Sequence, residues 1–241
     1  MLRECWRQGG SPGAAFEIAE RDDGFISVVD GAHYFAPLET LSPPDLWACE
    51  RVTGRVLDVG CGAGRHAVPL MAKEHDVTGV DPSPGAVHVA SSRGVTVIQG
   101  TIDDLTASGT FDTALLMGNN LGLLEGDERG RQVLDRLAAL VRPGGRLIGS
   151  GVDPRTESDP EHLAYQARNR ARGRMPGQLR IRVRYRGLSS PWFDYLHASL
   201  DDLRTLTAGT AWTISDAIVG PFRYAVMLTR QPSHHRPAAY R

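Results

Sequence analysis

A glycine-rich turn directly after a short apolar run most constrains what this chain can fold into. Residues 56–64 read Val-Leu-Asp-Val-Gly-Cys-Gly-Ala-Gly, which predicts a strand at residues 55–59, a tight turn, and a helix at residues 64–74. Glycine lets the backbone turn sharply and lets a ligand approach more closely than a Cβ atom permits. The N-terminus of the following helix offers unpaired N–H groups to an anionic or polar ligand group. We therefore expect a ligand to bind at this turn.

The chain from residue 55 to about residue 148 alternates short apolar runs with helical stretches. This alternation predicts a parallel sheet that is covered by helices on both faces. The first 50 or so residues predict a capping segment with a helix at residues 43–51. The other strands of this region are expected at residues 76–80, 95–99, 111–117 and 146–149, with helices at residues 85–92 and 129–141.

The alternation of apolar runs and helical stretches ends at about Asp153. A helix is expected first, and then a strand whose apolar residues alternate and which can pair with the following segment as a hairpin. Another helix and two strands complete the prediction. These elements are expected at residues 161–172, 178–186, 191–199, 199–207, 212–219 and 224–229.

Asp81 makes the glycine turn more specific. It ends the next expected strand, 17 residues after Gly64, where a carboxylate can accept hydrogen bonds from both hydroxyls of a ribose. The pattern differs from the dinucleotide-binding fingerprint because position 65 is Arg, so the third glycine comes one residue too early. The alternative interpretation is a tight strand–helix turn with an incidental acid.

Five segments together resemble the motifs of the class I S-adenosylmethionine (SAM)-dependent methyltransferases. The resemblance implies an α/β fold with a Rossmann-like, seven-stranded, mostly parallel sheet, helices on both faces, and a helix-and-hairpin lid insert. It also implies SAM as cofactor and S-adenosylhomocysteine as product. The five segments are residues 58–64, 77–83, 99–105, 111–124 and 140–145.

The resemblance suggests a division of the chain into five parts. The SAM-binding core is followed by the lid insert, and a C-terminal helix and strand pair complete the core. The expected parts are a cap at residues 1–50, the core at 51–153, the insert at 154–199, the helix and strand pair at 200–230, and a tail at 231–241.

The resemblance also implies which residues hold the cofactor. The glycine loop would face the methionine portion, Asp81 would hold the ribose, and Pro82 and Ile102 would sandwich the adenine. Many relatives carry Asp where this chain has Thr101, so the adenine amino contact stays open between Asp103 and its neighbours. The expected cofactor-binding residues are Asp58, Gly60, Cys61, Gly62, Gly64, Asp81, Pro82, Ile102, Asp103, Met117 and Gly118.

Residues that hold the methyl acceptor are expected at the carboxyl ends of the strands, where open α/β sheets bind ligands. Asn119 and Asn120 follow the fourth strand and are expected to bind the acceptor. No Pro-Pro-aromatic run follows Asn119, which weakens an interpretation as a DNA-base methyltransferase. Asp153 either acts as a base or substrate anchor, or starts a turn before the proline that follows it. Tyr34 either closes the pocket or packs in an aromatic cap.

The helix expected at residues 161–172 carries further candidates for the catalytic base. Its spacing places His162, Tyr165, Asn169 and Arg172 on one face. This face either forms a wall of the acceptor site, with His162 or Tyr165 as base, or is a solvated polar stripe.

An arginine-rich stretch lies in the expected insert. Three interpretations compete: a solvated strand edge whose charge discourages unwanted pairing, a subunit interface, or a site for an anionic acceptor. An RNA methyltransferase would use such a patch for phosphates, but the patch is short and the rest of the chain compensates its charge. The eight arginines are at positions 168, 170, 172, 174, 180, 182, 184 and 186.

Composition narrows the class of protein. The net charge of −1 gives no reason to expect nucleic acid as a partner. No run of 18 apolar residues predicts a membrane span, and the polar N-terminus lacks the apolar core of a signal peptide. Three widely separated cysteines fit a reducing cytoplasm and argue against a disulfide frame or a structural zinc site. No metal is expected, and homo-oligomerisation is left open.

These observations lead to one functional expectation with two alternatives. The chain is expected to be an enzyme that methylates nitrogen, oxygen or carbon of a small-molecule acceptor, in a biosynthetic tailoring step. The alternatives are an RNA or protein methyltransferase that uses the arginine-rich insert, and a non-catalytic SAM-binding protein.

Overall fold

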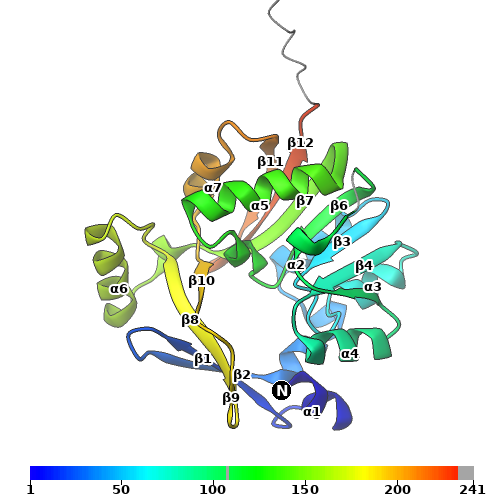
Figure 1. Ribbon diagram of the computed structural model, residues 1–241, viewed down its shortest axis with the longest axis horizontal. Coiled ribbons are helices and arrows are strands. Elements are labelled where there is room, and N and C mark those ends of the chain that lie inside the picture. Colours follow the sequence, from blue (N-terminus) through cyan, green and yellow to red (C-terminus); the bar gives the residue numbers. More distant parts are fainter. Residues whose placement is uncertain (107–108, 233–241) are drawn as a thin grey trace, which may run out of the picture.

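The protein is built around a seven-stranded sheet, shown in Figure 1 as a computed structural model that describes residues 1–106 and 109–232. Its strands, in chain order, are β3 (Val56–Val59), β4 (Val77–Asp81), β5 (Thr96–Gln99), β6 (Phe111–Leu116), β7 (Val141–Val152), β11 (Trp212–Val219) and β12 (Arg223–Arg230). The spatial order is β11-β12-β7-β6-β3-β4-β5. Strands β7, β6, β3, β4 and β5 run parallel to one another. Strand β12 is antiparallel to β7, and β11 is antiparallel to β12. The predicted Rossmann-like, mostly parallel sheet is therefore confirmed. Most of the expected tail, from residue 233 on, lies outside the described residues.

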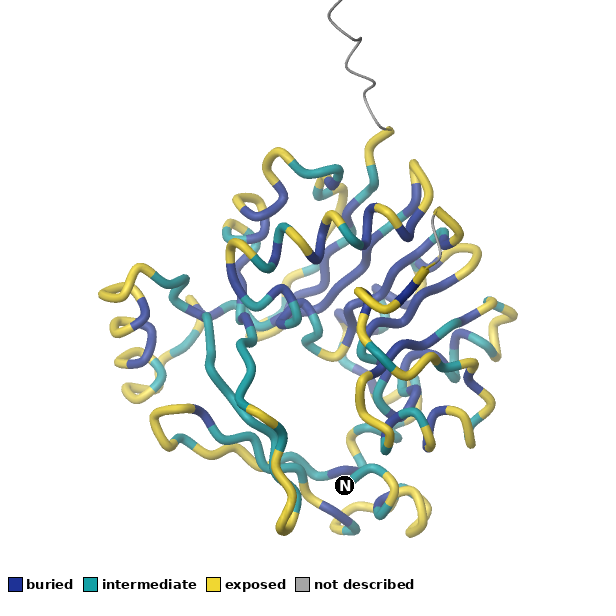
Figure 2. The backbone as a smooth tube through the Cα atoms, viewed as in Figure 1, coloured by how far each residue is buried: buried dark blue, intermediate teal, exposed yellow. Residues whose placement is uncertain are grey.

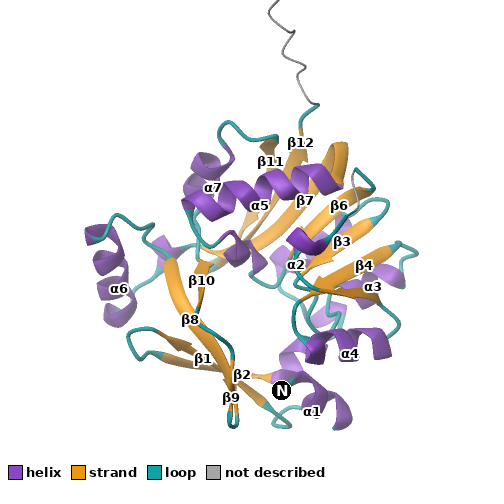
Figure 3. Cartoon of the chain, in the orientation of Figure 1, coloured by secondary structure: helices purple, strands orange, loops and turns teal. Residues whose placement is uncertain are grey.

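Helices cover both faces of this sheet (Figure 3). They are α2 (Pro43–Glu50), α3 (Ala67–Met71), α4 (Pro84–Ser92), α5 (Asp127–Leu140) and α7 (Leu200–Thr207). The two other α-helices of the described residues are α1 (Leu2–Arg7) and α6 (Pro160–Ala171). Successive strand residues point to opposite faces, so Leu57 belongs to the core cluster with α5 and α7. Its neighbour Val56 belongs to the cluster with α2, α3 and α4. Neither α1 nor α6 contributes a residue to these two clusters.

The helix after the glycine turn is shorter than expected. The prediction placed it at residues 64–74, whereas α3 spans only Ala67–Met71. Gly64 has a φ of +78° and Glu74 a φ of +65°, and residues in this left-handed region do not continue a right-handed helix. The predicted bounds were wrong at both ends for this reason.

A second sheet faces the carboxyl ends of the parallel strands (Figure 1). Its strands are β1 (Phe16–Arg21), β2 (Ile26–Asp30), β8 (Gln178–Tyr185), β9 (Leu188–Ser189) and β10 (Phe193–Leu196). The order is β10-β8-β1-β2, and β9 pairs with β8. The pairing of β8 with β10 agrees with the expected hairpin, but the pairing of β8 with the N-terminal strand β1 was not expected. The predicted cap and the predicted insert thus share one sheet.

The charge of the arginine-rich stretch is partly neutralised within the chain. Strand β8 lies between β10 and β1, so the interpretation as a solvated edge strand was wrong. Arg182 and Arg184 both pair with Glu20 of β1 at 2.9 Å. Further pairs join Arg168 to Asp23, and Arg174 and Arg180 to Asp194. Glu20 and Asp23 come from the N-terminal segment, whereas Asp194 belongs to the insert itself.

Helix α6 is held to the second sheet by buried polar side chains. The Tyr165 hydroxyl donates to Asp22 Oδ1 at 2.7 Å and accepts from the Arg180 amide at 3.2 Å. Asn169 Nδ2 donates to the carbonyls of Pro176 and Gln178. The face of α6 that carries these two residues is therefore packed against the sheet, and it is not a solvated stripe.

We predict that Tyr165→Phe lowers the free energy of unfolding by about 1 kcal/mol, because it removes the hydrogen bonds that the hydroxyl of this buried side chain makes with Asp22 and Arg180. Urea unfolding at equilibrium measures this change. Tyr185→Phe is the matched control on β8, since its hydroxyl has no hydrogen-bond partner among the described residues. Equal stability of the Tyr165→Phe variant and the native protein would contradict this account of α6.

Candidate functional site

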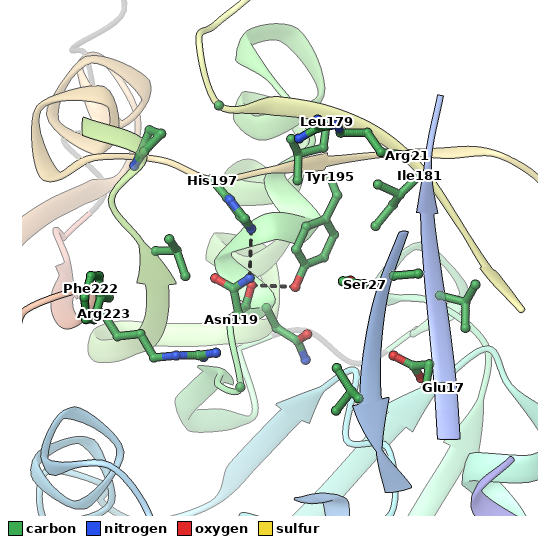
Figure 4. A pocket seen from close by; sticks show the side chains of 18 of the residues that line it. Glu17, Arg21, Ser27, Asn119, Leu179, Ile181, Tyr195, His197, Phe222 and Arg223 are labelled. Atoms are coloured by element: carbon green, nitrogen blue, oxygen red, sulfur yellow. Dashed lines mark hydrogen bonds between the residues drawn. The ribbon is translucent and has the colours of Figure 1, made fainter. Parts of the chain in front are cut away.

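A cavity of about 890 Å³ lies between the two sheets. Alternate residues of the second sheet face it, and these side chains are only half-buried, in contrast to the buried large sheet (Figure 2). Figure 4 shows how side chains from both sheets converge on the cavity. Its lining includes Gly60, Cys61, Gly62, Met117, Gly118 and Asn119 from the large sheet, and Glu17, Ala19, Ile181, Val183, Phe193 and Tyr195 from the second sheet.

The glycine loop is braced by a side chain from beyond β6. Gly60 has a φ of +69°, and a Cβ atom on it would lie 2.6 Å from Asn120 Nδ2. That amide donates to the carbonyls of Val59 and Gly60, each at 2.9 Å. Asn120 was predicted to bind the acceptor; it lines the cavity, but its amide is used to hold the loop. The geometry thus gives Asn120 a positioning role.

Two buried acids lie beside the loop. Asp81 accepts from the backbone amides of Gly62 and Ser83, each at 2.9 Å, and burial raises its pKa while these hydrogen bonds oppose the rise. Asp58 is 2% exposed, and its Oδ2 has no hydrogen-bond partner among the described residues. Burial, and then the charge of Asp81, raises the pKa of Asp58 to about 7. The loop therefore carries a buried carboxyl oxygen that lacks a partner.

The residues expected to hold adenine lie outside the lining of this cavity. Pro82 and Ile102 follow the ends of β4 and β5, where Ile102 is buried and Pro82 is exposed. Asp103 is exposed and forms an ion pair with Arg129 at 2.6 Å. Its carboxylate is thus already engaged, and the structure does not bring it to the cavity.

The end of β6 joins the two sheets. Met117 is buried, and the next two residues adopt the left-handed conformation, with φ of +69° at Gly118 and +74° at Asn119. Such a conformation is strained for a residue with a side chain and is held by its surroundings. The Tyr195 hydroxyl donates to the Asn119 carbonyl at 2.6 Å, and Asn119 Nδ2 lies 3.3 Å from His197 Nε2 (Figure 4). Asn119 Oδ1 is buried without a partner among the described residues.

The predicted bases line the cavity but have partners. Asp153 accepts from the backbone and side chain of Arg155, which agrees with the turn that was the alternative interpretation. His162 Nδ1 lies 2.7 Å from Arg21 Nη1, while no described residue forms a hydrogen bond with its Nε2. The Tyr165 hydroxyl forms hydrogen bonds with Asp22 and the Arg180 amide, and its role as a base stays a prediction.

The N-terminal segment contributes a hydrogen-bonded pair to the cavity. Tyr34, predicted to close the pocket, lines it and donates to Glu17 Oε1 at 2.9 Å. Burial raises the pKa of Glu17, and the hydrogen bond from Tyr34 opposes that rise. Tyr34 therefore also positions the carboxyl group of β1.

Sequence reasoning missed other residues of the cavity wall. Tyr195 lies on β10, which pairs with β8, and His197 directly follows that strand; their spacing of two residues in extended chain places them on one face. That alternation was the one available signal. Burial, and then the charge of Arg223, lowers the pKa of His197 to about 4, so its imidazole is neutral at pH 7. Arg65 and Arg223 carried no local signal for a shared site.

Comparison with known proteins assigns the core. Residues 56–145 match a family model described as a methyltransferase domain. The ubiquinone biosynthesis O-methyltransferase of Vibrio parahaemolyticus is 33% identical over 137 residues, which cover 52% of this chain and 57% of that protein. The enzyme of the same description from Azorhizobium caulinodans is 36% identical over 111 residues, covering 43% of this chain and 42% of that protein. The matched region thus spans about half the length of these relatives.

The whole fold, including the second sheet, resembles solved structures. A SAM-dependent methyltransferase from Bacteroides fragilis, in complex with S-adenosyl-L-homocysteine, matches with a TM-score of 0.79 at 21% identity, over 96% of this chain and 93% of that chain. A SAM-dependent methyltransferase from Methanosarcina mazei matches with a TM-score of 0.64 at 15% identity, over 79% and 98% of the two chains. At these identities the likeness shows the fold alone. Residues 56–145 thus match the methyltransferase domain family, and the chain as a whole has the fold of the solved SAM-dependent methyltransferases.

Proposed function

We propose that this protein transfers a methyl group from SAM to nitrogen, oxygen or carbon of a small-molecule acceptor that is held between the two sheets. The observation that carries the proposal is the cavity of about 890 Å³, which joins the glycine loop and Gly118 to the inner face of the second sheet. Cavities of about 300–1,000 Å³ suit small molecules. The O-methyltransferases of ubiquinone biosynthesis among the relatives support a role in biosynthetic tailoring.

The residues around the glycine loop fit SAM. The unpartnered Oδ2 of Asp58 suits a cationic ammonium group, because a buried carboxylate without a partner is costly. No atom lies within 4 Å of the place where a Cβ atom on Gly62 would be, so a ligand can approach the backbone there. Asp81 retains lone pairs for ribose hydroxyls, and Ile102 and Pro82 would contact the adenine. When bound, SAM supplies a methyl group that is activated by a positively charged sulfur.

The chain's own residues would orient the acceptor and exclude water from it. Apolar side chains of the second sheet, such as Ile181 and Phe193, form one wall. Asn119 Oδ1 can accept a hydrogen bond from a hydroxyl or amine of the acceptor, and neutral His197 holds the other end of the Asn119 amide. His162 Nδ1 accepts from Arg21, so the neutral imidazole carries its proton on Nε2, which can donate a hydrogen bond to an oxygen or nitrogen atom of the acceptor.

The alternatives from the sequence are less well supported. Five of the eight arginines of the insert pair with acids of the second sheet or of the turn between β1 and β2, which leaves less charge for RNA phosphates. A non-catalytic SAM-binding protein would not need an acceptor cavity beside Gly118. The three cysteines are free and buried, which supports a cytoplasmic location as part of the proposal. Within the described residues, no helix is long and apolar enough to cross a membrane.

Calorimetric titration with SAM, S-adenosylhomocysteine and NAD tests the cofactor, and transfer of a radiolabelled methyl group across a panel of small molecules tests the reaction. We expect binding of SAM and S-adenosylhomocysteine, no binding of NAD, and labelling of at least one small molecule. Binding without transfer to any acceptor would favour the non-catalytic alternative, and labelling of RNA or protein alone would favour a macromolecular acceptor.

We predict opposite effects of Asp58→Asn on stability and on cofactor binding. The folded-state pKa of Asp58, about 7, lies above its ordinary value of 3.8, so the folded protein binds the extra proton and loses stability as pH rises through this range. Asparagine cannot ionise, so the unfolding free energy of the variant relative to the native protein should rise by about 2 kcal/mol between pH 5 and pH 8. Affinity for S-adenosylhomocysteine should fall about tenfold or more at pH 8, because a charge-assisted hydrogen bond is lost.

Denaturant unfolding at both pH values and calorimetry measure these two effects. Asp135→Asn, at an exposed position of α5, is the matched control and should change neither quantity. A difference in stability that does not vary with pH would show that Asp58 titrates normally, and unchanged affinity would remove it from the cofactor site.

A further inference from the structure

A cluster of basic side chains lies in the cavity wall beside the glycine loop. Arg65, Arg223 and His33 all line the cavity. Arg65 Nη1 lies 2.7 Å from His33 Nε2, so the imidazole is the hydrogen-bond acceptor of this pair. Burial, and then the charges of Arg65 and Arg223, lowers the pKa of His33. The positive charge of this wall therefore resides on the two guanidinium groups.

The Arg65 charge is buried and poorly compensated. Its side chain is 10% exposed, and its Nε has no hydrogen-bond partner among the described residues. The carboxylate nearest to it, that of Asp45, lies 3.9 Å from Nη2. Asp45 also accepts from the Ser42 hydroxyl at 2.9 Å and lies 3.8 Å from His66 Nε2. Burying a cation has a desolvation cost that a close carboxylate would offset. Asp45 is distant from Arg65 and also interacts with Ser42 and His66, so it offsets this cost only in part.

Arg223 adds a second cation to the same wall. It is the first residue of β12 and is exposed, and its side chain extends into the cavity on the side of Asn119 (Figure 4). Among the described residues it has neither a carboxylate partner nor a side-chain hydrogen bond. Burial lowers the pKa of Arg65, the charge of Asp45 opposes this, and the charge of Arg223 lowers it further, so the two guanidinium groups act on each other in the cavity wall.

The carboxyl groups that line the cavity are engaged elsewhere. Glu17 accepts from Tyr34, and burial raises its pKa. Asp153 pairs with Arg155, and Glu157 accepts from the backbone amides of the two residues that follow it. None of these groups forms an ion pair with Arg65 or Arg223 in the described residues. The cavity thus offers two cations for an anion that the protein does not supply.

We propose that Arg65 and Arg223 form a binding site for a carboxylate of the ligand. The inference rests on the proposed function and deepens it, because the carboxylate belongs either to the amino-acid portion of SAM or to an acidic methyl acceptor. Guanidinium groups bind carboxylates through charge-assisted, often bidentate hydrogen bonds. Arg65 directly follows the glycine loop and Arg223 lies on the side of Asn119, so the pair spans the boundary between the two ligand regions.

Calorimetry with two matched pairs of probes tests the site in Arg65→Met, Arg223→Met and the native protein. S-Adenosylhomocysteine is compared with 5′-methylthioadenosine, which lacks the amino acid, and benzoate is compared with neutral benzamide, with and without saturating S-adenosylhomocysteine. Arg172→Met, at an exposed position outside the cavity lining, is the control. Arg223 is exposed, so its variant keeps the test valid should Arg65→Met fail to fold.

We expect at least one variant to weaken the charged member of a pair about tenfold and to change its neutral partner less than twofold. A selective loss of S-adenosylhomocysteine assigns the site to the cofactor carboxylate, and a selective loss of benzoate assigns it to the acceptor. Unchanged affinities for S-adenosylhomocysteine and benzoate in both variants would overturn the proposal. If benzoate does not bind the native protein, an unchanged affinity for S-adenosylhomocysteine in both variants overturns it. Equal losses of charged and neutral probes would overturn it as well.

Failure of the proposed function gives a different result. A native protein that binds neither S-adenosylhomocysteine nor 5′-methylthioadenosine would remove SAM as the cofactor. The benzoate titrations without S-adenosylhomocysteine would then still decide whether Arg65 and Arg223 bind a carboxylate.

Discussion

The turn after β3 is held by side chains from both neighbouring strands, and the site depends on this arrangement. Asp81 at the end of β4 accepts from the Gly62 amide, and Asn120 beyond β6 donates to the carbonyls of Val59 and Gly60. The loop is thus fixed from two sides before any ligand binds, which lowers the ordering cost of binding. The cost is a buried, unpartnered oxygen on Asp58, and a cationic ligand group would relieve it.

The second sheet turns this loop into an enclosed site. The N-terminal hairpin and the insert cover the cavity together, because β1 of the hairpin pairs with β8 of the insert in one sheet. Ion pairs such as Arg182–Glu20 join them on the side away from the cavity, while Ile181 and Val183 of β8 line it. The contacts of Tyr195 and His197 with Asn119 then connect this sheet to the end of β6.

Local patterns predicted the core because its signals are local. The glycines after β3 and the buried strands of the parallel sheet are encoded within short windows, and the family resemblance rests on these same segments. The pairing of β1 with β8 joins residues far apart in the sequence, and β1 is half polar because its inner residues face a cavity. The ion pairs of Arg168, Arg182 and Arg184 could not be predicted for the same reason, since their partners Glu20 and Asp23 lie in that distant segment.

The central claim is that the cavity between the sheets places a methyl acceptor beside a SAM molecule bound at the glycine loop. A crystal structure of the protein with S-adenosylhomocysteine tests this most directly. We predict that the amino-acid portion lies against Gly60–Gly62, the ribose hydroxyls contact Asp81, and the sulfur faces the part of the cavity that Gly118 and the second sheet enclose. S-Adenosylhomocysteine bound elsewhere, or with its sulfur facing away from the second sheet, would contradict the account.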